Sequence, residues 1–375
     1  MQTAIPCTLM RGGTSKGMVF HQDDLPTDPE VRDKVLLAAM GSPDPRQIDG
    51  VGGAHPLTSK VAVIGPASVP GADVDYLFLQ VVVDKAQVLD TQNCGNILAC
   101  VGPWAIENGL VAATGDQTPV RIHMVNTGSL AVATVQTPHG RVSYTGQARI
   151  DGVPGSHAPV SLNFLDVAGS LCGQLLPTGR PVDRVDQIDL TLIDNGMPVA
   201  IMDAASLGLR GDESPADLEA DQALKSRVEK IRLAVGGLMN LGDVSGKSVP
   251  KMTLVSPPVA NGAINTRSFI PHRVHEAIGV FGAVSVATAC VIPDSVAARV
   301  CRLPATGAAG ATLIDVEHPT GFFSVSIELD EQAEQVVVSR SALLRTARKL
   351  MRGEVYVPES VWGGPGPVIQ GSASA

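Results

Sequence analysis

Two segments of this chain would each form a helix that is apolar on nearly every face. The first covers 93–110, NCGNILACVGPWAIENGL, and the second covers 271–292, PHRVHEAIGVFGAVSVATACVI. A helix that is apolar all round must be buried all round. Both segments are rich in small residues and interrupted by glycine or proline, so neither fits a membrane-spanning helix. The rest of the chain must therefore enclose two central helices.

Residue types at the ends of these segments set the expected helix limits. Asn93 is a favourable N-cap residue and Gly109 a favourable stop for the first helix. Pro271 lies at the start of the second helix and Pro293 follows its end. We therefore expect both segments to be helical over their whole length.

β-Strands are predicted to cover these two helices. Stretches with two-residue alternation or β-branched runs, separated by turn residues, recur through both halves of the chain. They cover 59–67, 74–89, 119–137 and 141–150, and then 187–202, 250–258, 311–329 and 335–344. Each half also holds one amphipathic helix, predicted over 29–40 and over 215–235.

The two halves repeat the same order of features. A glycine turn between strands, LMRGGTSKGMVF, has a counterpart in IDNGMPVAIM 183 residues later, and the two apolar helices lie a similar distance apart. We infer an α+β fold with two similar domains, 1–184 and 185–375, each a curved, mainly antiparallel sheet wrapped round a buried central helix. A cleft between the domains, faced by both helix N-termini, would attract an anion, and we expect the active site there.

The formal net charge of −9 limits the partners of the chain. Non-specific binding to nucleic acid or to an acidic membrane needs a basic surface, so neither partner is expected. The N-terminus lacks the basic and long apolar segments of a signal peptide, and we expect a cytoplasmic location. The expected partner is a small-molecule substrate, and a homodimer is the expected assembly. An anionic substrate must be held by locally clustered cations.

The loop RGGTSKG places Arg11, Gly13, Thr14, Ser15 and Lys16 between two apolar runs. A nucleotide-binding Walker A loop requires GxxxxGK[ST], whereas the lysine here precedes the glycine, which argues against that motif. Two interpretations are left. The loop is either a glycine turn with a polar tip, or a cradle in which backbone N–H groups, a hydroxyl and a cation hold a non-nucleotide anion.

The same Thr-Ser-Lys trio recurs in DGVGGAHPLTSKVAV, where it ends in Lys60 and enters an apolar strand. Partial burial near other cations disfavours the ammonium form of a lysine and makes the free amine available as a base. The alternative is a lysine at a strand edge with its head group in water. Lys60 is therefore a candidate general base.

Cys94 lies in the first turn of the first apolar helix. The helix dipole and the free N–H groups there stabilise a thiolate, and such a cysteine is suited to proton transfer. The alternative is a small buried apolar residue, an interpretation that fits Cys100 and Cys290 better because both lie deep within helices. The six cysteines show no CxxC pair, so neither a zinc site nor a disulfide framework is indicated.

A basic segment, NTRSFIPHRVHEAIG, runs into the second apolar helix. It concentrates four potential cations, namely Arg267, His272, Arg273 and His275. At a helix N-terminus in an acidic chain, such a cluster predicts a clamp for a polycarboxylate. A solvated basic turn is the alternative. A metal site on the two histidines is disfavoured because the segment offers no third ligand beyond Glu276.

Taken together, five motifs resemble the PrpF family in order and spacing over nearly the whole chain. They are MRGGTSKG, DGVGGAHPLTSK, QNCGNILACVGPWAIENGLV, VPKMTLVSPP and NTRSFIPHRVHEAIGVFGAVSVATAC. The resemblance implies the diaminopimelate-epimerase-like fold and an isomerase, without cofactor or metal, that moves a proton on a small unsaturated polycarboxylate. It also implies that the catalytic lysine and cysteine of the family fall on Lys60 and Cys94.

The resemblance further implies where the substrate binds. The candidate binding residues are Arg11, Gly13, Thr14, Ser15, Lys16, Ser59, Asn93, Gly95, Asn96, Arg267, His272, Arg273, Gly282 and Ala283. It favours 4-oxalomesaconate as the substrate, with 2-methylaconitate as the first alternative. A carboxylate-binding protein without catalytic activity is the alternative from another functional class.

The chain departs from the wider superfamily at one position. Epimerases of this fold place a cysteine at the N-terminus of each central helix, and the two thiols exchange a proton on opposite faces of the substrate. Here the second position, FGAVSVA, offers no cysteine, and Cys290 lies about two turns too deep. A two-thiol racemisation is therefore disfavoured, whereas a lysine and a cysteine acting together on an allylic or keto-enol proton remain compatible with the sequence.

Overall fold

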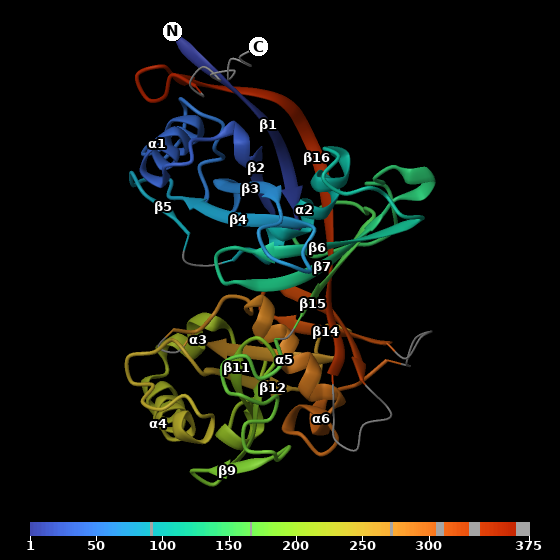
Figure 1. Cartoon of the computed structure of the whole chain (residues 1–375). Coiled ribbons are helices and arrows are strands. Elements are labelled where there is room, and N and C mark those ends of the chain that lie inside the picture. Colours follow the sequence, from blue (N-terminus) through green and yellow to red (C-terminus); the bar gives the residue numbers. More distant parts are fainter. Residues whose placement is uncertain (91–92, 166, 271–272, 305–310, 330–337, 365–375) are drawn as a thin grey trace. The chain divides into compact units, whose positions relative to one another are not determined.

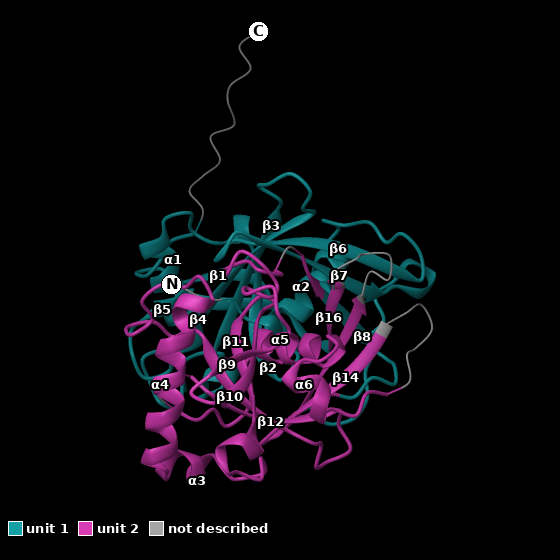
Figure 2. Ribbon diagram, turned by 90° about the horizontal axis from the view of Figure 1, so that it is seen from below, with its two compact units in different colours: residues 1–149, 153–162, 345–375 teal, residues 150–152, 163–344 magenta. Residues whose placement is uncertain are grey.

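The computed structural model has two compact units (Figure 2). The structure describes residues 1–90, 93–165, 167–270, 273–304, 311–329 and 338–364. Unit 1 consists of residues 1–149, 153–162 and 345–375, and unit 2 of residues 150–152 and 163–344. The chain thus returns to unit 1 at its C-terminal end, whereas the sequence analysis divided it once, after residue 184. None of the helices in the described part of the chain is both long enough and apolar enough to span a membrane.

Unit 1 is built on one curved sheet (Figure 1). Its strands are β1 (Gln2–Gly12), β2 (Ser15–His21), β3 (Lys60–Pro66), β4 (Val74–Val81), β5 (Val88–Leu89), β6 (Gln117–Met124), β7 (Ser129–Gln136), most of β8 (Pro159–Phe164) and the later part of β16 (Val338–Pro358). The strand order is β1-β2-β3-β4-β6-β7-β8, with β16 antiparallel to β1. The pairs β2–β3 and β4–β6 are parallel, and the remaining pairs with a described register are antiparallel.

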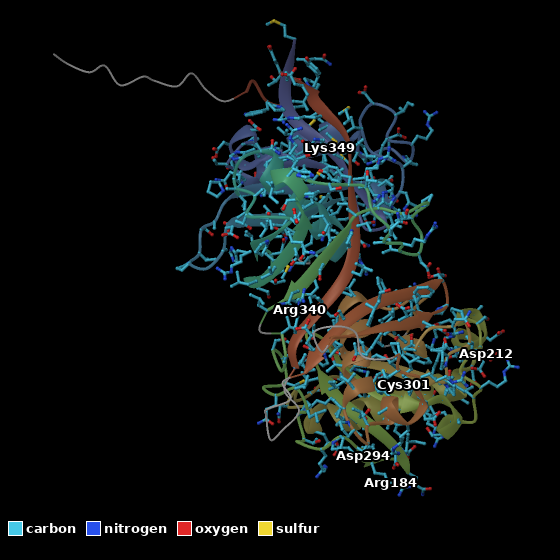
Figure 3. All side chains as sticks on the ribbon, turned by 90° about the vertical axis from the view of Figure 1, so that its right-hand side faces the viewer. Arg184, Asp212, Asp294, Cys301, Arg340 and Lys349 are labelled. Carbon is cyan, nitrogen blue, oxygen red and sulfur yellow. The ribbon has the colours of Figure 1, made fainter. Side chains whose placement is uncertain are left out.

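The sheet of unit 1 wraps round helix α2 (Gly95–Glu107), which contacts strands β1 to β4, β6 and β7. The Trp104 indole donates a hydrogen bond to the Thr8 hydroxyl of β1 at 3.1 Å. Lys349 of β16, labelled in Figure 3, pairs with Glu107 at the far end of α2 at 2.9 Å. The prediction of a buried first helix is confirmed. It begins at Gly95, however, so Cys94 rather than Asn93 is the N-cap residue.

Unit 2 repeats this plan. Its strands are β9 (Asp183–Val185), β10 (Ile188–Asp194), β11 (Pro198–Asp203), β12 (Lys251–Ser256), β13 (Ile264–Phe269), β14 (Ala311–His318), β15 (Gly321–Leu329) and the beginning of β16. From β10 to β15 the neighbouring pairs alternate antiparallel, parallel, antiparallel, parallel, antiparallel, as they do from β1 to β7. The predicted duplicated α+β fold is therefore confirmed.

The helices occupy matching places in the two units. Helix α1 (Pro29–Met40) follows the first hairpin of unit 1, and α4 (Gln222–Leu238) follows the first hairpin of unit 2. The buried helix of unit 2 is α5 (Val280–Val291), which contacts β10, β11, β14 and β15. The remaining helical segments are α3 (Pro215–Ala220), α6 (Val296–Val300), η1 (Gln22–Asp24), η2 (Pro56–Thr58), η3 (Pro138–Gly140) and η4 (Ala204–Leu207).

Two predicted helices differ from the structure. The helix predicted over 215–235 is broken in two at Asp221, whose carboxylate caps α4 by accepting a hydrogen bond from Leu224 N. The second apolar helix begins at Val280, not at residue 271. Within residues 273–279 no helix forms, and Val274 makes an isolated β-bridge with Phe269.

Two strand predictions also differ. No strand forms over 141–150, where the structure has one isolated bridge, between Ala148 and His157, and β8 takes the place beside β7. Conversely, β13 covers the beginning of the basic segment, where the sequence analysis predicted no strand.

Two helix glycines predict opposite effects of the same substitution. A Cβ added at Gly102 in α2 would lie 2.8 Å from a methyl of Val135, whereas a Cβ at Gly237 in α4 would meet nothing within 4 Å. We expect Gly102→Ala to lower the free energy of unfolding by about 1–3 kcal/mol through overpacking. Gly237→Ala should leave it unchanged or raise it by up to about 1 kcal/mol. Urea denaturation of both variants measures the difference, and equal stabilities would contradict the tight enclosure of α2.

Candidate active site

The β1–β2 hairpin packs directly against the first turn of α2. A Cβ at Gly12 would lie 2.4 Å from the Asn96 carbonyl oxygen, and a Cβ at Gly13 would lie 2.1 Å from Asn96 Oδ1. Gly13 also has a φ of +52°, which other residues rarely adopt. Asn96 in turn donates from Nδ2 to the Thr14 hydroxyl at 3.1 Å. The motifs RGGTSKG and NCGN, far apart in the sequence, therefore meet in unit 1.

Cys94 is the N-cap residue of α2, and its half-buried side chain makes no capping hydrogen bond. Its carbonyl accepts hydrogen bonds from Leu98 N at 2.9 Å and from the buried Tyr76 hydroxyl at 3.3 Å. The backbone at Cys94 is thus held on both sides while the thiol stays available. Gly95 and Asn96 follow in the first turn, where backbone N–H groups attract negative charge.

Arg345 is a functional candidate that the sequence analysis did not find. This β16 residue is 3% exposed, and burial lowers the pKa of its guanidinium to about 10, while the charge of Cys94 acts in the opposite direction. The next residue, Thr346, accepts a hydrogen bond from Gly13 N at 2.9 Å, which ties this part of β16 to the hairpin. A buried positive charge therefore interacts with the cysteine at the helix N-terminus.

Arg11 fastens the hairpin to β16. Its NH1 donates to Gly13 O at 2.9 Å and to the carbonyl and hydroxyl oxygens of Thr346 at 3.0 Å each. Burial, and then the positive charge of Arg348, lower the pKa of Arg11. The NH1 group of this predicted binding residue therefore makes structural hydrogen bonds.

Three polar atoms of unit 1 are buried without a hydrogen-bond partner among the described residues. They are Arg11 NH2, the hydroxyl of Ser15 and Asn93 Oδ1. The Asn93 amide nitrogen, by contrast, donates to the Thr127 hydroxyl at 2.6 Å. Buried polar atoms nearly always have hydrogen-bond partners. Two of these atoms belong to the β1–β2 hairpin and one lies just before α2, so they favour a bound ligand between the hairpin and the start of the helix. Lys16, half-buried on β2, lies opposite Arg11 in the strand register.

Lys60 is the first residue of β3 and is 8% exposed. Its Nζ donates to Gln80 Oε1 at 2.8 Å and lies 5.0 Å from the centre of the Phe78 ring. Within the residues that the structure describes, no carboxylate pairs with this amine. A Cβ at Gly17, opposite Lys60 on β2, would lie 2.5 Å from the Lys60 carbonyl oxygen, so glycine is needed there.

Ser59, another predicted binding residue, is fully buried. Its hydroxyl donates to Gln47 Oε1 at 2.6 Å, so this group supports the loop before Lys60.

In unit 2 the basic segment does not form the predicted cluster of four cations at a helix N-terminus. Arg267 lies on β13, where its Nε donates to Glu213 O at 2.6 Å and its NH1 to Thr266 O at 2.8 Å. His275 accepts a hydrogen bond at Nδ1 from Ala277 N, and burial lowers its pKa, so it is neutral at pH 7. Arg273 is exposed, and His272 lies outside the described residues.

The first turn of α5 resembles that of α2 in one respect and differs in another. The β10–β11 hairpin packs on it, since a Cβ at Gly196 would lie 2.6 Å from the Phe281 ring. Gly282 and Ala283, both predicted binding residues, are buried in this turn. The N-cap residue, however, is Gly279, so no thiol stands where unit 1 has Cys94.

The other thiols of the central helices lie deeper. Cys290 is 2% exposed, and a hydrogen bond with Cys301 together with burial raises its pKa well above that of an ordinary thiol. Cys301, labelled in Figure 3, lies at the end of α6. In the ranges that the structure covers, no three or more His, Cys, Asp or Glu side chains come together as a metal site would require.

The charge of Arg345 predicts the reactivity of Cys94. Arg345→Met removes a buried positive charge that interacts with Cys94, so alkylation of Cys94 by iodoacetamide at pH 7 should slow. Arg348→Met, an exposed arginine on the same strand, is the matched control and should react as the wild type does. Peptide mass spectrometry measures the rate at Cys94. Equal rates in all three proteins would show that Arg345 does not act on the thiol.

Related proteins were found by sequence. The family described as PrpF protein matches residues 2–358. A (4E)-oxalomesaconate Delta-isomerase of Novosphingobium sp. strain KA1 is 62% identical over 352 residues, which cover 94% of this chain and 97% of that protein. A 4-oxalomesaconate tautomerase of Pseudomonas putida is 58% identical over 364 residues, covering 97% of this chain and 99% of that protein.

A solved structure is also similar. The crystal structure of a methylitaconate-delta-isomerase matches with a TM-score of 0.85 at 36% sequence identity, over 96% of this chain and 97% of that chain. The fold of this chain is therefore one that a known isomerase adopts.

Proposed function

This chain belongs to the PrpF protein family, and we propose that it is an isomerase that tautomerises 4-oxalomesaconate, an unsaturated tricarboxylate of gallate degradation, without a cofactor. Two relatives that share more than half of its residues over nearly their whole length carry the name of this substrate. The alternative substrate, 2-methylaconitate, is also an unsaturated tricarboxylate, so charge alone does not separate the two. The high identity to the oxalomesaconate enzymes favours the first.

One observation supports the chemistry most strongly. Unit 1 holds a nearly buried lysine, Lys60, whose amine contacts a neutral amide and an aromatic ring, together with a cysteine, Cys94, at a helix N-cap. The neutral amine can take up a proton, and the thiol can give one. A proton shift within a conjugated system needs a group for each task.

The proposed reaction begins with Lys60 as the neutral amine. It removes a proton from the carbon next to the keto group, and the electron pair of that C–H bond moves into the conjugated system. Backbone N–H groups of the first turn of α2 and the buried charge of Arg345 stabilise the developing enolate. Cys94 delivers or relays the proton at the other end of the conjugated system. Proton return from the Lys60 ammonium to the thiolate, directly or through water, restores both groups.

The candidate binding residues of unit 1 have parts in this proposal. Ser15 and Arg11 each keep a buried polar atom available for a substrate carboxylate, and Lys16 adds a second cation. In unit 2, Arg273 and the first turn of α5 are proposed to bind the remaining carboxylates. The cleft between two domains, the cytoplasmic location and the homodimer stay predictions.

Two lysines in identical Thr-Ser-Lys trios give a matched test of the mechanism. Lys60→Ala should lower kcat by at least about 100-fold, the lower range for loss of a general base. Lys16→Ala removes a binding cation and should act mainly on KM. Steady-state kinetics with 4-oxalomesaconate measures both effects. Near-normal kcat in Lys60→Ala would refute the assignment of the base.

A comparison of substrates tests the function itself. The purified protein should turn over 4-oxalomesaconate with a kcat/KM at least about tenfold above that for 2-methylaconitate, since the two substrates place their carboxylates differently around the same donors. In D₂O the product should carry deuterium at the position of the moved proton. Binding of either compound without turnover or deuterium incorporation would favour the non-catalytic carboxylate-binding alternative.

A further inference from the structure

The loop before Lys60 is held by two glutamine side chains that no part of the proposed mechanism uses. Gln47 Oε1 accepts hydrogen bonds from the Ser59 hydroxyl at 2.6 Å and from Ala54 N at 2.8 Å. Gln80 of β4 makes the second set of contacts, and the strand register places it directly opposite Lys60. The glycine-rich motif DGVGGAHPLTSK thus ends at a lysine that faces a fixed amide.

The orientation of the Gln80 amide follows from its partners. Its Nε2 donates to Ser59 O at 3.0 Å and to Pro56 O at 3.1 Å. Both partners are carbonyl oxygens and accept only, so the amide nitrogen must face them. Gln80 Oε1 must then face Lys60 Nζ, at 2.8 Å. Rotating the amide by half a turn would lose both hydrogen bonds to the carbonyl oxygens and place the amide oxygen against them.

The charge state of the neighbours matters as much as their direction. An amide oxygen accepts a hydrogen bond from an ammonium or from a neutral amine, and it favours the ammonium much less than a carboxylate would. The second neighbour, the Phe78 ring, carries no net charge, and its face attracts an ammonium far less than a carboxylate would. The site therefore holds the Lys60 amine in place without an ion pair that would keep it protonated.

Other titratable groups lie on the elements around β3. Strand β2 carries Lys16, one residue before the position opposite Lys60, and η2 follows His55. Asp75 and Tyr76 lie toward the far end of β4, where Asp75 is opposite Gly65 and pairs with His123. Helix α2 brings Cys94 at its N-cap and Glu107 at its other end, and η1 brings Asp23 and Asp24. Among these groups, none is a carboxylate in contact with Nζ.

We propose that Gln80 is a positioning residue for Lys60, which fixes the direction of the amine and leaves it free to exchange a proton because the fixing group is a neutral amide. This inference rests on the proposed role of Lys60 as the base. It explains why a side chain of this length carries an amide here instead of a carboxylate.

The test replaces the amide by a carboxylate of the same shape. In Gln80→Glu, the acid limb of the kcat profile should move to higher pH by at least about one unit, the lower range for an opposite charge at this distance. Activity at pH 7 should fall about tenfold or more and recover at higher pH. Gln117→Glu, the same change at an exposed position of β6, is the matched control and should leave the profile in place. An unmoved profile in folded Gln80→Glu would overturn either the effect of Gln80 or the role of Lys60 as the base, and the labelling measurement below decides between them.

A second measurement separates this inference from the proposed function. Acetylation of Lys60 by acetic anhydride, followed across pH by peptide mass spectrometry, reports the fraction of neutral amine without any substrate. In Gln80→Glu this labelling should need a pH higher by at least about one unit. A shift in labelling without a shift in kcat would retain the effect of Gln80 and reject Lys60 as the base. No shift in labelling would overturn the effect of Gln80.

The carboxylate of Gln80→Glu would also face two carbonyl oxygens, and this repulsion could prevent folding. A third variant tests the proposal in that case. Gln80→Met keeps the length of the side chain and removes the acceptor. We expect kcat to fall at least about tenfold, as for a mispositioned general base, with KM within about twofold of the wild type. Circular dichroism and the alkylation rate of Cys94 should be unchanged. A wild-type kcat in this variant would overturn the proposal.

Discussion

Burial of a helix that has no polar face is the constraint on which this structure depends. Helix α2 must be covered on every side, and strands from β1 to β7 supply that cover within one unit. The N–H groups of its first turn have no partner within the helix, so they remain for a ligand. The glycines of the β1–β2 hairpin let the sheet approach this turn closely. Enclosure of the helix and formation of an anion-attracting end are thus consequences of one packing arrangement.

The sequence was most informative where the signal is local. Helix α1 matches its predicted range, and the apolar pattern located both central helices, because residues three or four apart decide which faces are buried. Strand β13 was not predicted because its sequence is polar. The Nε of its buried Arg267 donates to the carbonyl of Glu213, a distant residue in the sequence, and no local pattern reveals this contact. Arg345 was not predicted for a similar reason, since beyond residue 344 the strand pairs with β1 at the opposite end of the chain.

The identical Thr-Ser-Lys trios show how little the residues of a motif say about its chemistry. Lys16 is half-buried in β2 opposite Arg11, whereas Lys60 is nearly buried at the beginning of β3 against Gln80 and Phe78. The difference comes from the residues opposite each lysine across the sheet. The sequence identifies both lysines as candidate residues. The register of β3 and β4 then shows which amine is held by a neutral acceptor.

The duplication itself separates the parts of the site that belong to the frame from those that belong to the chemistry. In unit 2, Lys251 is the first residue of β12, as Lys60 is the first residue of β3. Burial, and then the charge of Arg232, lower the pKa of Lys251. The register between β12 and β13 begins at the next residue, where Met252 pairs with Phe269, and it holds no glutamine in the place of Gln80. The N-cap of α5 is Gly279. Unit 2 therefore repeats the lysine and the helix end but neither the fixed amide nor the thiol, and this asymmetry favours a proton shift between an amine and one thiol over an exchange between two thiols.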